Sequence, residues 1–253
     1  MRLKDKVAIV TGGSQGIGAA ICKAYAREGA KVIVVNKSNL ERAQGIVDAI
    51  LAEGGMAQAI RCDVTDTADC QALVDAVIKQ YGRIDILVNN VGLAIFKLFE
   101  EQSIEDWDFM FNTNIRSAFL LSRLVVPHMK EQHFGKLIFI SSIAANIGFK
   151  TLSAYSATKG AMHALVKTMV SELAEFNINV NLLSPGSTDT PGNATFVNDP
   201  EISEAIKQNT PTKTGFMRAE DLAGPAVFLA SEEAKAIHGV DLIVDNGVSA
   251  VSV

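Results

Sequence analysis

The sequence has no apolar run approaching about 18 residues, the length typical of a membrane-spanning helix. It also has no concentrated basic block: 23 basic and 28 acidic side chains leave a formal net charge of −5, which argues against nucleic acid or an anionic membrane as the main partner. The charged residues 1–6 run directly into an apolar segment and leave no room for a signal peptide. We therefore expect a cytoplasmic protein whose partner is a small molecule.

Potential metal ligands are few and scattered. The three cysteines, Cys22, Cys62 and Cys70, are odd in number and lack the spacing of metal ligands. The four histidines lie apart from any cluster of Cys, Asp or Glu. The sequence thus predicts no metal site, and it predicts reduced, partly buried thiols.

No linker rich in Pro, Gly or Ser and no repeat divides the chain, so we expect a single domain over residues 1–253. Short apolar runs alternate with amphipathic segments, which predicts an α/β fold with a parallel sheet covered by helices on both faces. The expected strands are 7–10, 31–35, 57–62, 84–89, 136–141, 179–183 and 241–245.

A glycine-rich turn, residues 11–18, directly follows the first expected strand and precedes an amphipathic stretch. Gly12 permits the tight turn, Gly16 lets the backbone approach a pyrophosphate, and Gly18 lets helix and strand pack closely. The amides at the start of the helix would then face the anion. This order of strand, glycine loop and helix predicts dinucleotide binding.

Tyr155 and Lys159 are four residues apart, a spacing that places them on one face of a helix. A free phenol loses its proton near pH ~10, too high for easy proton exchange at neutrality. A close ammonium group favours the phenolate. The pair therefore indicates a candidate proton donor, although the same spacing also occurs on ordinary helix surfaces.

These segments resemble, in order and spacing, the motifs of the short-chain dehydrogenase/reductase family. Residues 11–18 resemble its TGxxxGxG loop, 63–64 its adenine contact and 89–92 its NNAG motif, while 185–186 with Thr190 resemble its PG motif. The resemblance covers almost the whole chain. Four residues match the family's catalytic tetrad: Asn114, Ser142, Tyr155 and Lys159.

The resemblance implies a Rossmann-type, doubly wound sheet of seven parallel strands, an assembly into homotetramers, and a role for each member of the tetrad. Tyr155 would donate a proton to a carbonyl oxygen, and Ser142 would give it a second hydrogen bond. Lys159 would lower the pKa of the tyrosine and bind the nicotinamide ribose. Asn114 would hold a water molecule. The alternative is that Asn114 is a helix residue whose side chain is bonded to the backbone. Ser141 is the competitor for the role of Ser142.

The residue directly after the second strand indicates the type of cofactor. An acidic residue there would bind the adenosine ribose and repel a 2′-phosphate. The chain has Asn36 there, followed by Lys37 and Ser38, which favours NADP(H) and leaves NAD(H) open. Gln15 departs from the family pattern, which often has a second basic residue in the loop. The residues expected to contact the cofactor are Gly12, Ser14, Gln15, Gly16, Ile17, Gly18, Asn36, Lys37, Ser38, Asp63, Val64, Asn90, Val91, Gly92, Tyr155, Lys159, Pro185, Gly186, Thr188 and Thr190.

Residues 186–219 contain several Pro and Gly, which disfavour one continuous helix. We expect a mobile substrate lid with a short helix near 201–209. Apolar side chains around the expected site would suit a small, apolar ketone or secondary alcohol. These side chains are Leu93, Ile95, Ile143, Ile147, Phe149 and Phe196.

The activity expected from these features is that of an NADP(H)-preferring carbonyl reductase or alcohol dehydrogenase. A 3-oxoacyl-carrier-protein reductase is one alternative, weakened because Glu131, Gln132 and Phe176 stand where basic residues would dock an acidic carrier. A glucose-dehydrogenase-like sugar oxidoreductase is a second alternative, since residues 185–200 resemble the lid of such enzymes. A nucleotide-binding regulatory protein without turnover is a third, and the intact tetrad argues against it.

Overall fold

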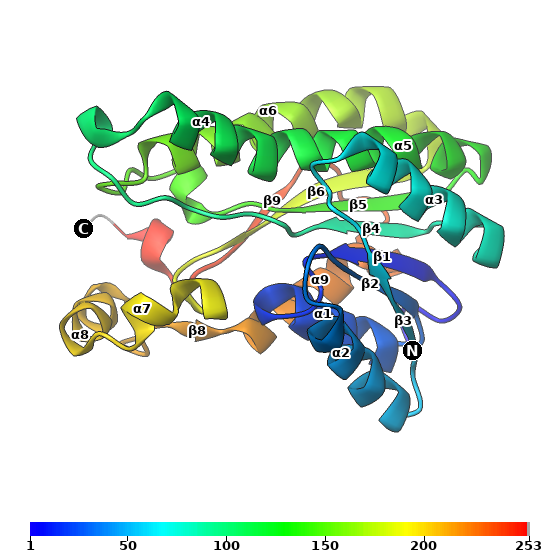
Figure 1. Ribbon diagram of the computed structural model, residues 1–253, viewed down its shortest axis with the longest axis horizontal. Helices are drawn as coiled ribbons and strands as arrows, with labels where there is room; N and C mark the ends of the chain where they lie inside the picture. Colours follow the sequence, from blue (N-terminus) through cyan, green and yellow to red (C-terminus); the bar gives the residue numbers. More distant parts are fainter. Residues whose placement is uncertain (252–253) are drawn as a thin grey trace.

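A computed structural model describes residues 1–251 and shows a seven-stranded parallel sheet in the order β3-β2-β1-β4-β5-β6-β9 (Figure 1). All of the expected strands are present, with ends shifted by no more than about two residues. This confirms the predicted α/β fold. The strands are β1 (Val7–Thr11), β2 (Lys31–Asn36), β3 (Met56–Arg61), β4 (Ile86–Asn89), β5 (Gly135–Ile140), β6 (Ile178–Pro185) and β9 (Asp241–Val244).

Helices cover both faces of the sheet (Figure 1). One face is covered by α1 (Gly16–Arg27), α2 (Leu40–Ala52) and α9 (Ala223–Ala230). The other is covered by α3 (Thr67–Tyr81), α5 (Ser117–Glu131) and α6 (Ser153–Leu173), and α4 (Ile104–Phe111) packs against α6.

The two cores follow from the alternation of side chains along each strand. In β1, Val7 and Ile9 pack against the α3, α5 and α6 side, whereas Ala8 and Val10 pack against the α1, α2 and α9 side. Because both faces are covered, the strands read as continuous apolar runs rather than as alternating patterns.

Short helical turns fill many connections. A π-helical turn (Asn112–Arg116) lies between α4 and α5, and a 3₁₀ turn (Ile143–Ala145) follows β5. The remaining 3₁₀ turns are Phe99–Glu101, Ala174–Phe176, Pro191–Asn193, Ala219–Leu222, Glu232–Ala234 and Val248–Ala250.

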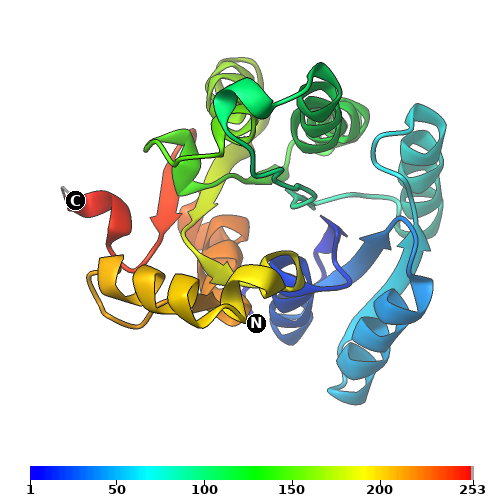
Figure 2. The same cartoon turned by 60° about the vertical axis from the view of Figure 1, so that its left-hand side comes forward.

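Residues 186–219 form a small layer of their own, beyond the end of the sheet where β6 leads into it (Figures 1 and 2). It contains a second, two-stranded sheet of β7 (Thr188–Asp189) and β8 (Met217–Arg218), with α7 (Ala194–Val197) and α8 (Pro200–Asn209). The helix expected near 201–209 is therefore confirmed as α8. The side chain of Asp199 caps this helix by accepting from the Glu201 amide at 2.9 Å.

The order of the strands predicts a ligand-binding crevice at the carboxyl edge of the sheet. β1 lies between β2 and β4, so the connections that leave β1 and β4 run to opposite sides of the sheet. The glycine loop follows β1, Asn90 follows β4, Ser142 follows β5 and Gly186 follows β6. Segments far apart in the sequence thus meet at one edge. Across residues 1–251, no helix has both the length and the apolar character needed to cross a bilayer.

Candidate active site

The glycine loop has the backbone that its sequence predicts. Gly12 and Gly16 adopt positive φ angles of 62° and 51°, which residues with side chains rarely adopt. A Cβ at Gly12 would lie 2.9 Å from Nδ2 of Asn90, and one at Gly18 would collide with the carbonyl oxygen of Gly12. Because α1 begins at Gly16, the loop and the free amides of the first helical turn form a cradle for an anion.

Asn90 joins this loop to the end of β4. Its side-chain amide donates to the carbonyl oxygen of Thr11 at 2.8 Å, and its backbone amide donates to Oγ1 of Thr11 at 2.9 Å. Val91 follows and lies against the same loop, 3.3 Å from the Cβ position of Gly12. The ends of β1 and β4 are therefore held together, as a cofactor bridging them would require.

Ser142, Tyr155 and Lys159 come together at the end of β5. Ser142 lies at the start of the 3₁₀ turn, where its Oγ accepts from the Ala144 amide at 3.1 Å, and its hydroxyl lies close enough to the Tyr155 phenol to lower the pKa of that group. Oγ of Ser141 instead lies 3.1 Å from Nε2 of His163, on the buried side of the strand. The geometry thus favours Ser142 over Ser141 as the partner of the tyrosine.

Lys159 is almost fully buried, with 3% of its surface exposed, and its Nζ donates to the carbonyl oxygen of Ile140 at 2.8 Å. Burial lowers the pKa of this ammonium group to about 8. Nζ lies 5.5 Å from the ring centroid of Tyr155, consistent with the expected shared helix face.

The pKa of the Tyr155 phenol lies above its ordinary value, because burial raises it more than the hydrogen bond to Ser142 lowers it. Lys159 was expected to lower this pKa, but in the protein by itself the pKa of Tyr155 is raised. The spacing of the two residues correctly places them together, but it carries no information about how deeply the phenol is buried.

Asn114, in the π-helical turn, is fully buried and bonded to protein groups. Its Oδ1 accepts from the Leu93 amide at 2.9 Å, and its Nδ2 donates to the carbonyl oxygen of Leu93 at 2.8 Å and to Oγ1 of Thr158 at 3.1 Å. A Cβ at Gly92 would lie 3.2 Å from Nζ of Lys159 and 3.6 Å from Oδ1 of Asn114. These bonds agree with the alternative of a helix residue held by backbone, and the water-holding role stays a prediction.

The burial of Lys159 leads to a testable effect on stability. Its pKa in the folded chain, about 8, lies below the ordinary 10.5, so folding penalises the ammonium below pH 8 and the penalty disappears as the pH rises to 10.5. The shift corresponds to about 3 kcal/mol, of which roughly 1 kcal/mol is offset by the bond to Ile140. Lys159→Met should therefore raise the free energy of unfolding by about 2 kcal/mol at pH 7, although it should remove activity.

Urea unfolding of both proteins at pH 7 and near pH 10.5 measures this effect. The gain should be largest at pH 7 and small at the higher pH. A Lys159→Met protein that is less stable than wild type at pH 7 would show that the ammonium stabilises the fold.

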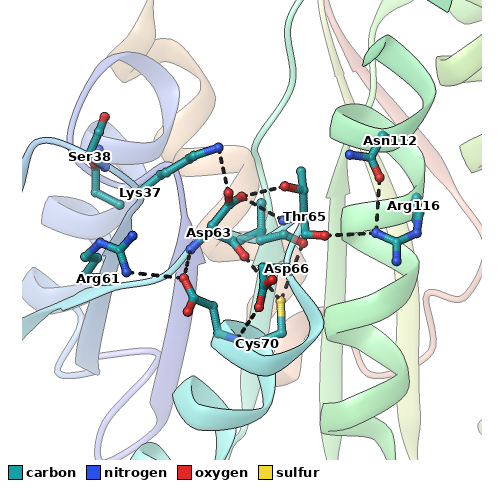
Figure 3. Close-up of polar contacts among 12 residues, drawn as sticks. Lys37, Ser38, Arg61, Asp63, Thr65, Asp66, Cys70, Asn112 and Arg116 are labelled. Atoms are coloured by element: carbon teal, nitrogen blue, oxygen red, sulfur yellow. Dashed lines mark hydrogen bonds and ion pairs between the residues drawn. The ribbon is translucent and has the colours of Figure 1, made fainter. Parts of the chain in front are cut away.

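The predicted adenine end of the site lies at the ends of β2 and β3 (Figure 3). Nζ of Lys37 lies 2.6 Å from Oδ2 of Asp63, and Oγ1 of Thr65 donates to Oδ1 of Asp63 at 2.7 Å. Burial opposes ionisation of this carboxyl, but the hydrogen bonds from Lys37 and Thr65 bring its pKa down to about 2. Val64 is buried beside it. The predicted adenine and phosphate contacts are therefore neighbours joined by an ion pair.

Asn36 connects this region to the glycine loop. Its Nδ2 is hydrogen-bonded to Oγ of Ser14, and its Oδ1 accepts from the Ser38 amide at 2.9 Å. The guanidinium group of Arg42, in the first turn of α2, is hydrogen-bonded to the side chain of Gln15. Sequence reasoning missed Arg42, although its place one turn into the helix after β2 signals a side chain that can reach back to the loop.

At the other end of the crevice, the connection after β6 returns to the glycine loop. A Cβ at Gly186 would lie 2.9 Å from Cβ of Asp245, so this close approach needs glycine. Oγ1 of Thr188 donates to the carbonyl oxygen of Gly186 at 2.9 Å. A Cβ at Gly16 would lie 3.2 Å from the methyl group of Thr190. The predicted PG motif therefore crosses directly over the loop.

An aromatic pair bridges the connection after β4 and the layer of residues 186–219. The rings of Phe96 and Phe196 are edge-to-face, with centroids 4.6 Å apart. Phe196 was among the apolar residues expected around the site, whereas Phe96 was not. Of the other expected residues, Ile143 is buried and Phe149 is exposed.

The part of the chain that the structure describes holds no group of three Cys, His, Asp or Glu side chains placed to bind a metal ion. Its three cysteines are free and buried.

Comparisons with known proteins match this geometry. The family model described as short chain dehydrogenase matches residues 6–201. A cyclopentanol dehydrogenase of Comamonas testosteroni is 36% identical over 250 residues, which cover 98% of this chain and 99% of the relative. A gluconate 5-dehydrogenase of Burkholderia cenocepacia, solved in complex with NADP and tartrate, superposes with a TM-score of 0.94 at 31% identity, covering 99% of this chain and 98% of that one. A 7α-hydroxysteroid dehydrogenase solved with NADH superposes with a TM-score of 0.93 at 36% identity, covering 97% of this chain and 95% of that one.

Proposed function

The chain belongs to the short-chain dehydrogenase family and is an NAD(P)-dependent oxidoreductase, and on this basis we propose that it is an NADP(H)-preferring reductase of small apolar ketones, or dehydrogenase of the matching secondary alcohols. The observation that carries the proposal is the proximity of the Ser142 hydroxyl, which lowers the pKa of the Tyr155 phenol, and of the buried Lys159, whose Nζ lies 5.5 Å from the Tyr155 ring centroid, at the edge where the glycine cradle lies.

The cradle at Gly12, Gly16 and Gly18 fits a dinucleotide, because a side chain at two of these positions would meet Asn90 or the Gly12 carbonyl. The nicotinamide cofactor supplies or accepts the hydride when bound. A carbonyl oxygen gains negative charge as its carbon gains hydride, so the oxygen needs hydrogen-bond donors.

In the proposed reaction, the Tyr155 phenol donates its proton to the carbonyl oxygen, and the Ser142 hydroxyl gives this oxygen a second hydrogen bond. A phenol whose pKa is raised stays protonated at neutral pH, which suits donation during ketone reduction. Lys159 would hold the ribose of the cofactor. For the alcohol, the same groups act in reverse, with Tyr155 accepting the proton.

The preference for NADP(H) is supported by positive charge near the end of β2. No carboxylate stands at Asn36, and the neighbouring segments carry two cations: Lys37, which is paired with Asp63, and Arg42, which is bonded to Gln15. A 2′-phosphate beside Asn36 would thus meet two cations and the Ser38 hydroxyl. Similar enzymes have been solved with NADP and with NADH, so the preference rests on these residues.

An apolar substrate is supported by the Phe96–Phe196 pair and by the similarity to a cyclopentanol dehydrogenase. Residues 186–219 would act as the lid that closes over the substrate. The gluconate 5-dehydrogenase similarity favours a second candidate, a sugar or polyol substrate.

A panel assay tests the proposal: cyclopentanone, 5-ketogluconate and a 3-oxoacyl carrier protein, each with NADPH and with NADH. We expect the highest kcat/KM for cyclopentanone with NADPH. A clear advantage for 5-ketogluconate would establish the second candidate, and an advantage for the carrier-bound substrate would establish a carrier-protein reductase.

The aromatic pair should restrict the size of the substrate. Phe196→Ala is expected to raise kcat/KM for a bulky aryl ketone about tenfold relative to cyclopentanone, since it opens space worth roughly 1–3 kcal/mol of discrimination. Phe99→Ala is the matched control, because Phe99 is 81% exposed. Substrate series with rings of increasing size measure the effect. If Phe196→Ala left the ratio of kcat/KM for the aryl ketone to that for cyclopentanone unchanged, the substrate would bind away from Phe196.

A homotetramer is supported by exposed aromatic side chains on α4 and α5. Trp107, Phe109 and Phe119 are 41%, 53% and 50% exposed there. Apolar area of this kind marks interfaces between chains. Light scattering of the purified protein measures the assembly.

A further inference from the structure

A polar cluster lies directly behind the catalytic serine, in a part of the fold that the proposed reaction does not use. Oγ of Ser141 lies 3.1 Å from Nε2 of His163, and this nitrogen lies 3.8 Å from Oδ2 of Asp241. The Asp241 carboxylate also accepts from Nδ2 of Asn146 at 2.8 Å and from Oγ of Ser184. The cluster joins β5, α6, β9, β6 and the loop after β5.

The cluster holds the chain on both sides of Ser142. Ser141, the residue before it, contacts His163, while Asn146, four residues after it, is tied to Asp241. Ser142 itself has no hydrogen bond to this cluster, and its Oγ accepts from the Ala144 amide and faces the Tyr155 phenol instead. The loop that carries the serine is therefore tethered at two points to one group of side chains.

The same cluster reaches the catalytic helix. His163 lies on α6, four residues after Lys159 and eight after Tyr155, so it shares their side of the helix. The contact between His163 and Ser141 thus connects the strand end that carries Ser142 to the helix that carries Tyr155. A shift of this contact would change the distance between the two catalytic hydroxyls.

We propose that His163 and Asp241 are positioning residues that set the Ser142–Tyr155 hydrogen bond by holding the loop after β5 against α6. This inference rests on the proposed roles of Ser142 and Tyr155. Neither positioning residue touches the substrate. The set of Ser141, His163 and Asp241 is not a hydrolytic triad, because Ser141 is 1% exposed and cannot reach a substrate.

The charge state of His163 sets the direction of its hydrogen bond with Ser141. Burial lowers the pKa of its ring below the ordinary value, Asp241 on β9 opposes this, and Lys167 on α6 adds to it. Ser141, directly after β5, and Ser184 on β6 are uncharged. The ring is therefore neutral at pH 7 and can accept from the Ser141 hydroxyl. As the pH falls through its pKa, Nε2 carries a proton and donates to Oγ of Ser141, and the pair with Asp241 becomes stronger.

The test compares His163→Ala with His163→Gln, which keeps an amide near the position of Nε2. Thr168→Ala on the exposed side of α6 is the control. We expect kcat for the best ketone to fall about 10- to 100-fold in His163→Ala, since small displacements of catalytic groups have effects of this size. The kcat of His163→Gln should lie within about threefold of the wild-type value. KM for the cofactor should be unchanged in both variants.

A second readout needs no turnover. Titration of the Tyr155 phenol, followed by NMR of 13C-labelled tyrosine and assigned with Tyr155→Phe, should show a higher pKa in His163→Ala and in Ser141→Ala, because a displaced Ser142 no longer stabilises the phenolate. Ser141→Ala removes one hydroxyl and serves if His163→Ala fails to fold. An unchanged Tyr155 titration in both variants, or a kcat within twofold of wild type, would overturn the inference. A wild-type enzyme without turnover on any ketone or alcohol would contradict the proposed function, while the titration would still decide the inference.

Discussion

Tyr155→Phe is expected to lower kcat for ketone reduction by about 10²- to 10⁴-fold, the usual contribution of a positioned general acid. The substitution removes the phenol oxygen that is bonded to Ser142 and keeps the ring, which is packed near Nζ of Lys159. The packing of α6 should therefore be preserved, and so should the Kd for the cofactor, whose cradle lies on the glycine loop. The large loss in kcat with unchanged cofactor binding is the signature of a lost proton donor.

Single-turnover rates, with cofactor Kd measured by fluorescence titration, separate these quantities. Tyr81→Phe is the matched control, because that phenol lies on α3 beside Gln80. A Tyr155→Phe enzyme that keeps more than about a tenth of wild-type turnover, with chemistry limiting the rate, would remove Tyr155 from the proposed role.

Sequence reasoning predicted best the elements that depend on local sequence patterns. The strands are short apolar runs, and their two-sided burial in the sheet explains why they show no alternation. The glycine loop was predictable because Gly12 and Gly16 need backbone angles that other residues avoid. Ser142 and Tyr155 could be placed together only through the family resemblance, since 13 residues separate them.

The contacts that were missed join residues far apart in the chain. Phe96 pairs with Phe196 across 100 positions, and nothing near either residue marks the other as its partner. His163 reaches Ser141 and Asp241 only because β5 and β9 both lie beside β6 in the sheet order. Such pairs depend on tertiary packing, which propensity and spacing do not encode.

The error on the pKa of Tyr155 has a similar cause. The spacing of Tyr155 and Lys159 predicts that a cation lies nearby, and the structure confirms this neighbourhood. Burial, however, penalises both charged forms: it raises the pKa of the phenol and lowers that of the ammonium to about 8. Proximity of charge and depth of burial are separate quantities, and only the first can be read from a helical repeat.

The preference between the two cofactors should depend on Lys37 and Arg42. An ammonium beside a 2′-phosphate forms a charge-assisted hydrogen bond worth roughly 1.5 to 3 kcal/mol, or about 10- to 100-fold in affinity. Lys37→Ala should therefore raise KM for NADPH by that factor and barely change KM for NADH, which lacks the phosphate. Arg42→Ala should act in the same direction, because its guanidinium group is held at Gln15, next to Ser14 and Asn36.

Arg61→Ala is the matched control, since this exposed cation at the end of β3 is paired with Asp69 at 3.4 Å. Asn36→Asp should favour NADH by adding a carboxylate that repels the 2′-phosphate and can bind the ribose. Steady-state kinetics with both cofactors measure all four variants. Because Lys37 is also paired with Asp63, its loss removes one partner of that carboxylate near the adenine contact. Equal weakening of both cofactors in Lys37→Ala would thus assign this lysine to the adenine contact alone, and a wild-type preference for NADH would overturn the proposed specificity.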